Sequence, residues 1–153
     1  WSADNMTILT RGAMQSLLSW ESPYDATRTN VIEWDTENLD NLGVWDSGSP
    51  GLITIQATGW YRIDVHLPTV MNSWSRAAIL KNSTNFGSGT DYLENVVHAI
   101  PHGSGLIPNV HLLHHPAVYL AANDVLRVTV IGTAGGNTGV DAEGCKLWLQ
   151  RLA

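Results

Sequence analysis

The alternation of apolar and polar residues over Gly59–Leu67 (GWYRIDVHL) predicts a β-strand with one buried face. Every second residue from Tyr61 onward is apolar, and polar residues stand between them. The segment Asp124–Gly132 (DVLRVTVIG) alternates in the same way. Successive side chains of a strand point to opposite faces, so six of them should point into a core or a subunit contact. These six are Tyr61, Ile63, Val65, Leu126, Val128 and Val130.

Further short β-rich segments follow one another along the chain, separated by turn-forming residues. They are residues 14–20, 30–35, 51–56, 76–82, 109–115, 117–121 and 144–153. The segment 92–100 has an apolar spacing that suits a helix as well as a strand. This pattern predicts one all-β domain over residues 1–153, a β-sandwich or jelly roll, with residues 1–12 as an N-terminal arm or linker.

Composition narrows the classes of partner. The net charge is -6 with only 8 Lys+Arg, and phosphate backbones repel such a surface, so we expect no nucleic-acid binding. No apolar run approaches the roughly 20 residues that span a bilayer, so we expect no membrane insertion. The single cysteine excludes an intrachain disulfide. A charged fraction of 14% with 7 Trp suits either a β domain with an ordinary aromatic core or a subunit whose broad faces are covered by copies of itself.

The sequence offers little for catalysis. It has no Gly-x-Ser-x-Gly turn for a nucleophilic serine. The glycine-rich segment Gly132–Gly139 lacks the Lys-Ser/Thr of a phosphate-binding loop, so we interpret it as a surface loop. Asp64 comes nearest to a carboxylate in an apolar strand, but it lies on the polar face. We therefore expect neither an enzyme nor a bound cofactor.

Two clusters raise the question of a metal. The acidic residues of 33–46 match the spacing of no calcium loop, and a solvated loop is the favoured interpretation. Five of the six histidines lie in a short stretch and form the second cluster: His98, His102, His111, His114 and His115. On a strand, His111 and His115 share one face while His114 takes the other, so one chain offers two ligands at best. A three-fold axis would be needed to complete a site, and we assign no metal residues.

The order of these segments resembles the C1q/tumour-necrosis-factor jelly roll, over Gln15 to Leu152. The motifs that carry the resemblance are Gly59, Tyr61 and Ile63 in one strand, Leu80 and Asn82 at a turn, and Leu120, Asp124 and Val125 at a hairpin. Ile63 stands where the family has Phe, Asn123 stands where it has Gly, and the final Phe-x-Gly signature is absent at Lys146–Leu149.

Within that family, the chain is similar to the C1q-like domains of tailed-bacteriophage tail and capsid-surface proteins. The residues that fit their Asp-x-x-Gly-x-Trp/His-Asp pattern are Asp40, Gly43, Trp45 and Asp46. The resemblance implies a virion structural protein at the particle surface, either a host-binding knob of the tail or a capsid decoration protein. Its implied partners are other virion proteins and a host receptor or glycan. The alternative is a carbohydrate-binding or glycan-cleaving jelly roll, because a Trp-rich surface suits sugar stacking.

The resemblance also implies a homotrimer, and six residues are named for its interface, for the core or for turns. Tyr61, with Ile63 and Trp60, is expected at the trimer interface or in the core. Gly59, Asn82 and Asp124 are expected in structural turns. Gly59 would let the chain turn sharply into its strand, and the Asp124 side chain would cap its own turn.

Overall fold

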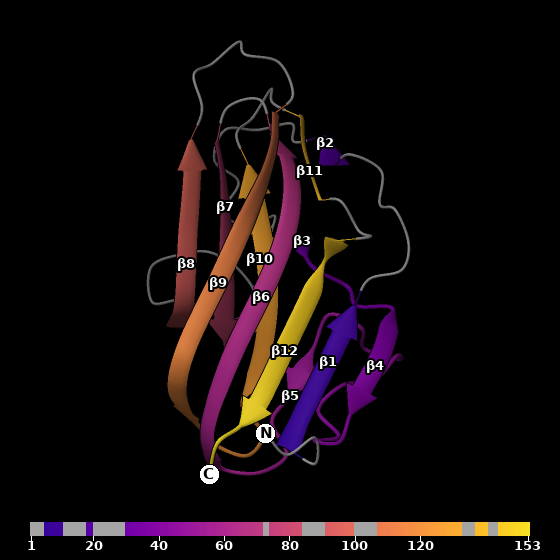
Figure 1. Ribbon diagram of the computed structural model, residues 1–153, viewed down its shortest axis with the longest axis vertical. Coiled ribbons are helices and arrows are strands. Elements are labelled where there is room, and N and C mark those ends of the chain that lie inside the picture. The colour runs from indigo at the N-terminus through magenta and orange to yellow at the C-terminus, as the bar shows by residue number, and fades with distance from the viewer. Residues whose placement is uncertain are drawn as a thin grey trace.

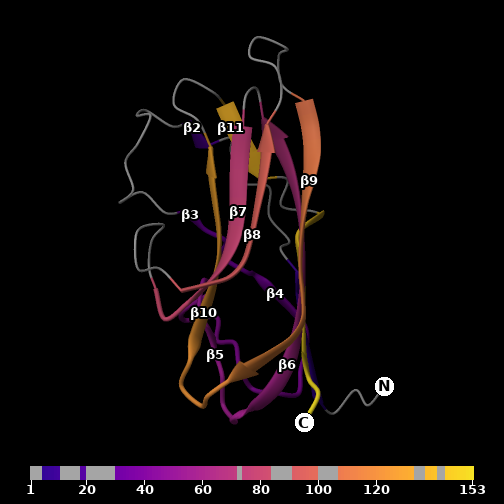
Figure 2. The same cartoon turned by 90° about the vertical axis from the view of Figure 1, so that its left-hand side faces the viewer.

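The computed structural model describes residues 5–10, 18–19, 30–71, 74–83, 91–99, 107–132, 137–140 and 144–153. They form two antiparallel β-sheets packed face to face as a jelly-roll sandwich, which confirms the predicted fold class (Figures 1 and 2). No helix among these residues is long and apolar enough to cross a membrane.

The front sheet has seven strands, and strand β6 lies at its centre. One edge of β6 pairs with β9, while the other edge pairs with β12 and β11; β12 continues to β1 and β4 (Figure 1). The strands of this sheet are β1 (Met6–Thr10), β2 (Leu18–Ser19), β4 (Thr36–Asp40), β6 (Gly59–Met71), β9 (Ile107–Leu120), β11 (Asn137–Val140) and β12 (Lys146–Arg151).

The back sheet has five strands, with β10 next to β7 and β7 next to β8. Two short strands, β3 and β5, both pair with β10. The strands of this sheet are β3 (Asn30–Val31), β5 (Ile53–Thr54), β7 (Trp74–Lys81), β8 (Asp91–Ala99) and β10 (Val125–Gly132).

The core lies between the two sheets and follows the predicted alternation. All six residues expected to point inward from the two alternating strands are at most 2% exposed. Trp34, at 1% exposed, and Leu113, also at 1%, join them from other segments. The period-two pattern therefore located the core side of both long strands.

Two regions that the sequence did not assign to a single strand each form one continuous strand. The ambiguous segment 92–100 is strand over Asp91–Ala99, because it pairs with β7 along nearly its whole length. The segments on either side of Pro116 are one strand, β9. The pairing of β9 with β6 shifts register between Tyr61 and Ile63, which is where β9 carries Pro116. Proline has no N–H for a regular ladder, and a register shift accommodates it.

Three expectations about loops are corrected by strand pairing. The expected arm, residues 1–12, contains β1, which pairs with both β12 and β4, so Met6–Thr10 belongs to the sandwich. Part of the acidic segment forms β4. Residues 137–139 of the glycine-rich segment lie in β11, which pairs with β6. In each case the partner strand is distant in the sequence, so local residue preferences did not show the pairing.

Gly59 is the first residue of β6, and the backbone of the C-terminal segment leaves no room for a Cβ at this position. Its backbone has no positive φ, whereas Gly43 has a φ of 61°. A Cβ on Gly59 would lie 2.2 Å from the carbonyl oxygen of Ala153. The C-terminal segment lies that close because it is hydrogen-bonded to Trp60: Trp60 N–H donates to Ala153, and Leu152 N–H donates back to Trp60. The expected sharp turn is therefore replaced by close contact between two backbones.

We expect Gly59→Ala to lower the free energy of unfolding by about 1–3 kcal/mol, the usual range for overpacking. The clash is with backbone, which a rotamer change cannot relieve. Urea unfolding followed by circular dichroism measures the effect. Gly48→Ala is the control, because a Cβ there meets only an Asp46 carboxylate oxygen at 3.4 Å. Equal stability of the two variants would contradict this account of Gly59.

Candidate functional site

The candidate site is the outward side of the four strands β9, β6, β12 and β1, which we call the outer face. No described strand covers it (Figure 2). The residues that alternate with the buried positions make up this face. They are Val110, Leu112, His114 and Tyr119 on β9; Trp60, Arg62, Asp64 and His66 on β6; Lys146, Trp148 and Gln150 on β12; and Met6 and Ile8 on β1.

Large apolar side chains are unusually exposed on one side of the outer face. Leu112 is 61% exposed, Tyr119 55%, Trp60 48% and Val110 37%. The rings of Trp60 and Tyr119 meet edge to face, with their centroids 5.5 Å apart. A cluster of this kind makes this side of the outer face a candidate binding surface.

A hollow of about 470 Å³ lies on the other side of the outer face. Its apolar lining comes from Met6, Ile8 and Trp148, and its polar lining comes from Arg62, Asp64 and Gln150. The outer face thus has an apolar strip on β9 and an apolar hollow over β12 and β1. Both regions are apolar, as the buried centre of a protein contact usually is.

A polar stripe on β6 separates the strip from the hollow. Arg62 Nε donates to Asp64 Oδ2 at 2.7 Å, and the other carboxylate oxygen of Asp64 contacts His114 Nδ1. His66, two residues further along, places its Nδ1 3.0 Å from the Gly144 carbonyl oxygen and therefore donates to it. Asp64 thus has a partner on each of its two carboxylate oxygens.

Two of the three residues expected at a trimer interface or in the core lie in the core. Trp60 lies on the outer face, whereas Tyr61 and Ile63 are each 1% exposed and lie inside the sandwich. The Tyr61 hydroxyl donates to the Ala57 carbonyl. Burial raises the pKa of this hydroxyl, with Arg151 and the Ala57 hydrogen bond opposing the rise. Tyr61 therefore takes the core alternative of the expectation, because its side chain is on the inward side of β6.

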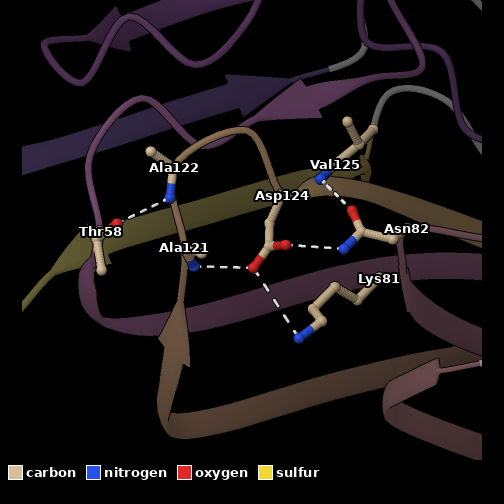
Figure 3. A network of polar contacts seen from close by, with 7 residues as sticks. All are labelled: Thr58, Lys81, Asn82, Ala121, Ala122, Asp124 and Val125. Carbon is tan, nitrogen blue, oxygen red and sulfur yellow. Dashed lines mark hydrogen bonds and ion pairs between the residues drawn. The ribbon is translucent and has the colours of Figure 1, made fainter.

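The expected structural turns of Asn82 and Asp124 form one network (Figure 3). Asp124 accepts from the Ala121 N–H at 2.8 Å, so it caps its own turn as expected. Asn82 Nδ2 donates to Asp124 at 2.7 Å, and Asn82 Oδ1 accepts from the Val125 N–H at 2.8 Å. Asn82 has a φ of 54°, a region that asparagine tolerates better than most residues. The network ties the end of β7 to the β9–β10 turn.

The charge state of Asp124 follows from these contacts. Desolvation raises its pKa, but the hydrogen bonds from Asn82 and Ala121 and the nearby Lys81 ammonium outweigh it, so the pKa is lowered overall. Lys81 Nζ lies 3.9 Å from the carboxylate. The carboxylate is therefore a structural anion.

The motif of Asp40, Gly43, Trp45 and Asp46 builds a loop. The Asp40 carboxylate accepts from the N–H groups of Val44 at 3.2 Å and Trp45 at 3.0 Å. Asp46 accepts from the Gly48 N–H at 2.8 Å. Both carboxylates accept hydrogen bonds from N–H groups of the loop, and Asp40 also accepts from the Thr7 hydroxyl of β1.

The histidines of β9 point to opposite sides, as the strand pattern predicted. His111 is fully buried, and His114 is exposed beside Asp64. The described residues contain no group of three or more His, Cys, Asp or Glu side chains that would hold a metal ion. His102 and the side chain of His98 lie outside the described part of the chain.

Most of the outer face was not identified from the sequence, although one signal was present. Leu112 and Leu113 are adjacent, so β9 carries a large apolar side chain on each of its two sides. A strand that is apolar on both sides is usually covered on both. Trp148 on β12 repeats the signal between buried Leu147 and Leu149.

Comparison with known proteins finds likeness in fold alone. No protein-family model and no curated protein matches the sequence. Among solved structures, Eiger TNF from S. frugiperda matches with a TM-score of 0.63 and 18% identity, covering 97% of this chain and 92% of that one. Murine APRIL at pH 8.5 matches with a TM-score of 0.62 and 12% identity, covering 97% and 98%. The chain therefore has the TNF-like jelly-roll fold.

We expect Asp124→Ala to lower the free energy of unfolding by about 2 kcal/mol, since it removes two hydrogen bonds to a charged group. The lowered pKa also predicts a pH dependence. Stabilisation by Asp124 is complete above the unfolded value of about 3.9 and is lost as pH falls through the lower folded value.

Acid unfolding of the wild type and of Asp124→Asn measures this second effect. The asparagine variant should be less stable at pH 7, and the gap between the two proteins should narrow below about pH 4. A constant gap from pH 7 to pH 2 would contradict the assigned role of the charge.

Proposed function

We propose that the chain is a non-enzymatic binding module that assembles with two further copies through the outer face. The observation that carries the proposal is the group of exposed apolar side chains beside the apolar hollow on a sheet that no described element covers. The TNF-like fold supports it, because the family that the sequence resembles closes as three copies around an axis.

The two apolar regions are compatible with a ring of copies. In a cyclic trimer each copy uses two different surfaces, one for each neighbour. The outer face offers two such surfaces, the strip with Leu112 and the hollow with Trp148. We infer that the strip of one copy packs into the hollow of the next.

Charge favours a second copy as the occupant. The chain as a whole is negative, with a net charge of -6. The outer face carries one described acid, Asp64, and two described bases, Arg62 and Lys146. Two copies can therefore approach by these faces without the repulsion that the rest of their charge would produce.

Leu112→Glu tests the interface. Leu112 is 61% exposed in the single chain, so the variant should fold with little change in melting temperature. In the assembly its carboxylate would be buried without a partner, and the concentration needed for trimerisation should rise at least about 100-fold. Light scattering at micromolar concentration measures the mass.

Ser47→Glu is the matched control, because it adds the same charge at an exposed turn away from the outer face. It should leave the mass unchanged. A folded wild-type monomer at micromolar concentration would refute assembly. A Leu112→Glu trimer as stable as the wild type would place the interface elsewhere.

The location that we propose for this module is the surface of a bacteriophage particle, where it would contact other virion proteins and a host receptor or glycan. This part rests on the sequence resemblance, including the loop of Asp40 and Trp45. Antibody raised against the chain should label intact particles in electron microscopy. Absence of the chain from purified particles would refute the location, and release of sugar from a host glycan would instead favour the glycan-cleaving alternative.

A further inference from the structure

We propose that His114 makes assembly through the outer face sensitive to pH, with assembly favoured when its ring is neutral and opposed when it is protonated. The inference rests on the proposed function, since it concerns the regulation of that same face. It starts from the contact between His114 and Asp64 in the polar stripe between the apolar strip and the hollow.

The stripe has a defined charge balance. Asp64 is 27% exposed and already holds Arg62 at 2.7 Å. With a neutral His114, the group of three side chains carries no net charge. With a protonated His114, two cations share one carboxylate and the group carries a net charge of one.

Assembly raises the free-energy cost of that extra positive charge, because it removes the charge from water. Leu112 precedes His114 by two residues on the same side of β9, and the hollow is lined by Arg62 and Asp64 themselves. In the proposed ring one neighbour covers the strip and the other covers the hollow, so the stripe lies between two covered surfaces. His114 is 53% exposed in the single chain and would lose that water. An excess charge removed from water is strongly disfavoured.

The surrounding groups do not offset the added charge. From β6, the groups that face His114 are Asp64, Arg62 and His66; from β12, beyond β6, they are Lys146 and the neutral Trp148 and Gln150. Its neighbours along the same side of β9 are Leu112 and Pro116. The described part of the outer face thus places one acid, Asp64, among four basic or potentially basic side chains, which are Arg62, Lys146, His66 and His114 itself.

The sign of the effect follows from linkage. Histidine side chains ordinarily titrate near pH 6.5. Because the assembled state excludes the proton, acidification through this range favours the separate copies. Three copies release up to three protons on assembly. The concentration at half-assembly should therefore rise about thirtyfold between pH 7.5 and pH 5.5.

Sedimentation of the full chain at a series of concentrations, from pH 8 to pH 5.5, tests the proposal. His114→Gln keeps a hydrogen-bonding side chain and removes the titration, so its half-assembly concentration should stay nearly constant with pH. Ser47→His is the control, because it adds a histidine at an exposed turn away from the outer face, and its pH dependence should equal that of the wild type. Circular dichroism at each pH establishes that the separated copies remain folded.

The possible outcomes distinguish a failure of the pH proposal from a failure of the proposed assembly on which it rests. If the wild type does not trimerise even at pH 8, the proposed assembly fails and the pH effect falls with it. If the wild type trimerises and assembly does not weaken at pH 5.5, the pH proposal alone is overturned. It is also overturned if His114→Gln keeps the full pH dependence, because another histidine then carries it.

Discussion

Strand β6 is the element on which the rest of the structure depends. Both of its edges are hydrogen-bonded to other strands, one of its sides faces the core, and the other side belongs to the outer face. Its inward side chains run from Tyr61 to Leu67 and fill the centre of the core. Its edges hold β9 on one side and β12 and β11 on the other. Its outward side chains form the polar stripe of the outer face. A shift of one residue in its register would exchange the core for that stripe, so the alternation specifies both at once.

Two contacts between distant segments hold the lower end of the sandwich, where β6 begins. At one, the C-terminal segment lies against Gly59 and exchanges hydrogen bonds with Trp60. At the other, Asp124 and Asn82 join the β9–β10 turn to the end of β7 (Figure 3). The Ala122 N–H also donates to Thr58 at 3.0 Å, which links the turn to the start of β6. These contacts position Trp60 and Tyr119, the aromatic pair of the outer face.

The outer face combines two properties that have opposite effects on its burial by another molecule. Its apolar strip and hollow favour contact with another molecule, and its stripe of Arg62, Asp64 and His114 would be costly to bury with the wrong charge. Such a combination gives an interface specificity, because only a partner that leaves the stripe balanced can cover it. A copy of the same chain meets that requirement without bringing in a new charge pattern.

The sequence by itself determined the all-β class, the inward residues of β6 and β10, and the turn role of Asp124. Each of these follows from local rules: the period of two in a strand, or the capping of a turn by its own side chain. Tertiary structure decided the rest. Only pairing with β12 and β4 makes Met6–Thr10 a strand, and only the packed C-terminal segment explains Gly59. The outer face is also tertiary, because Met6, Arg62, Leu112 and Trp148 become neighbours only when four strands far apart in the sequence lie in one sheet, and no local pattern states the order of strands.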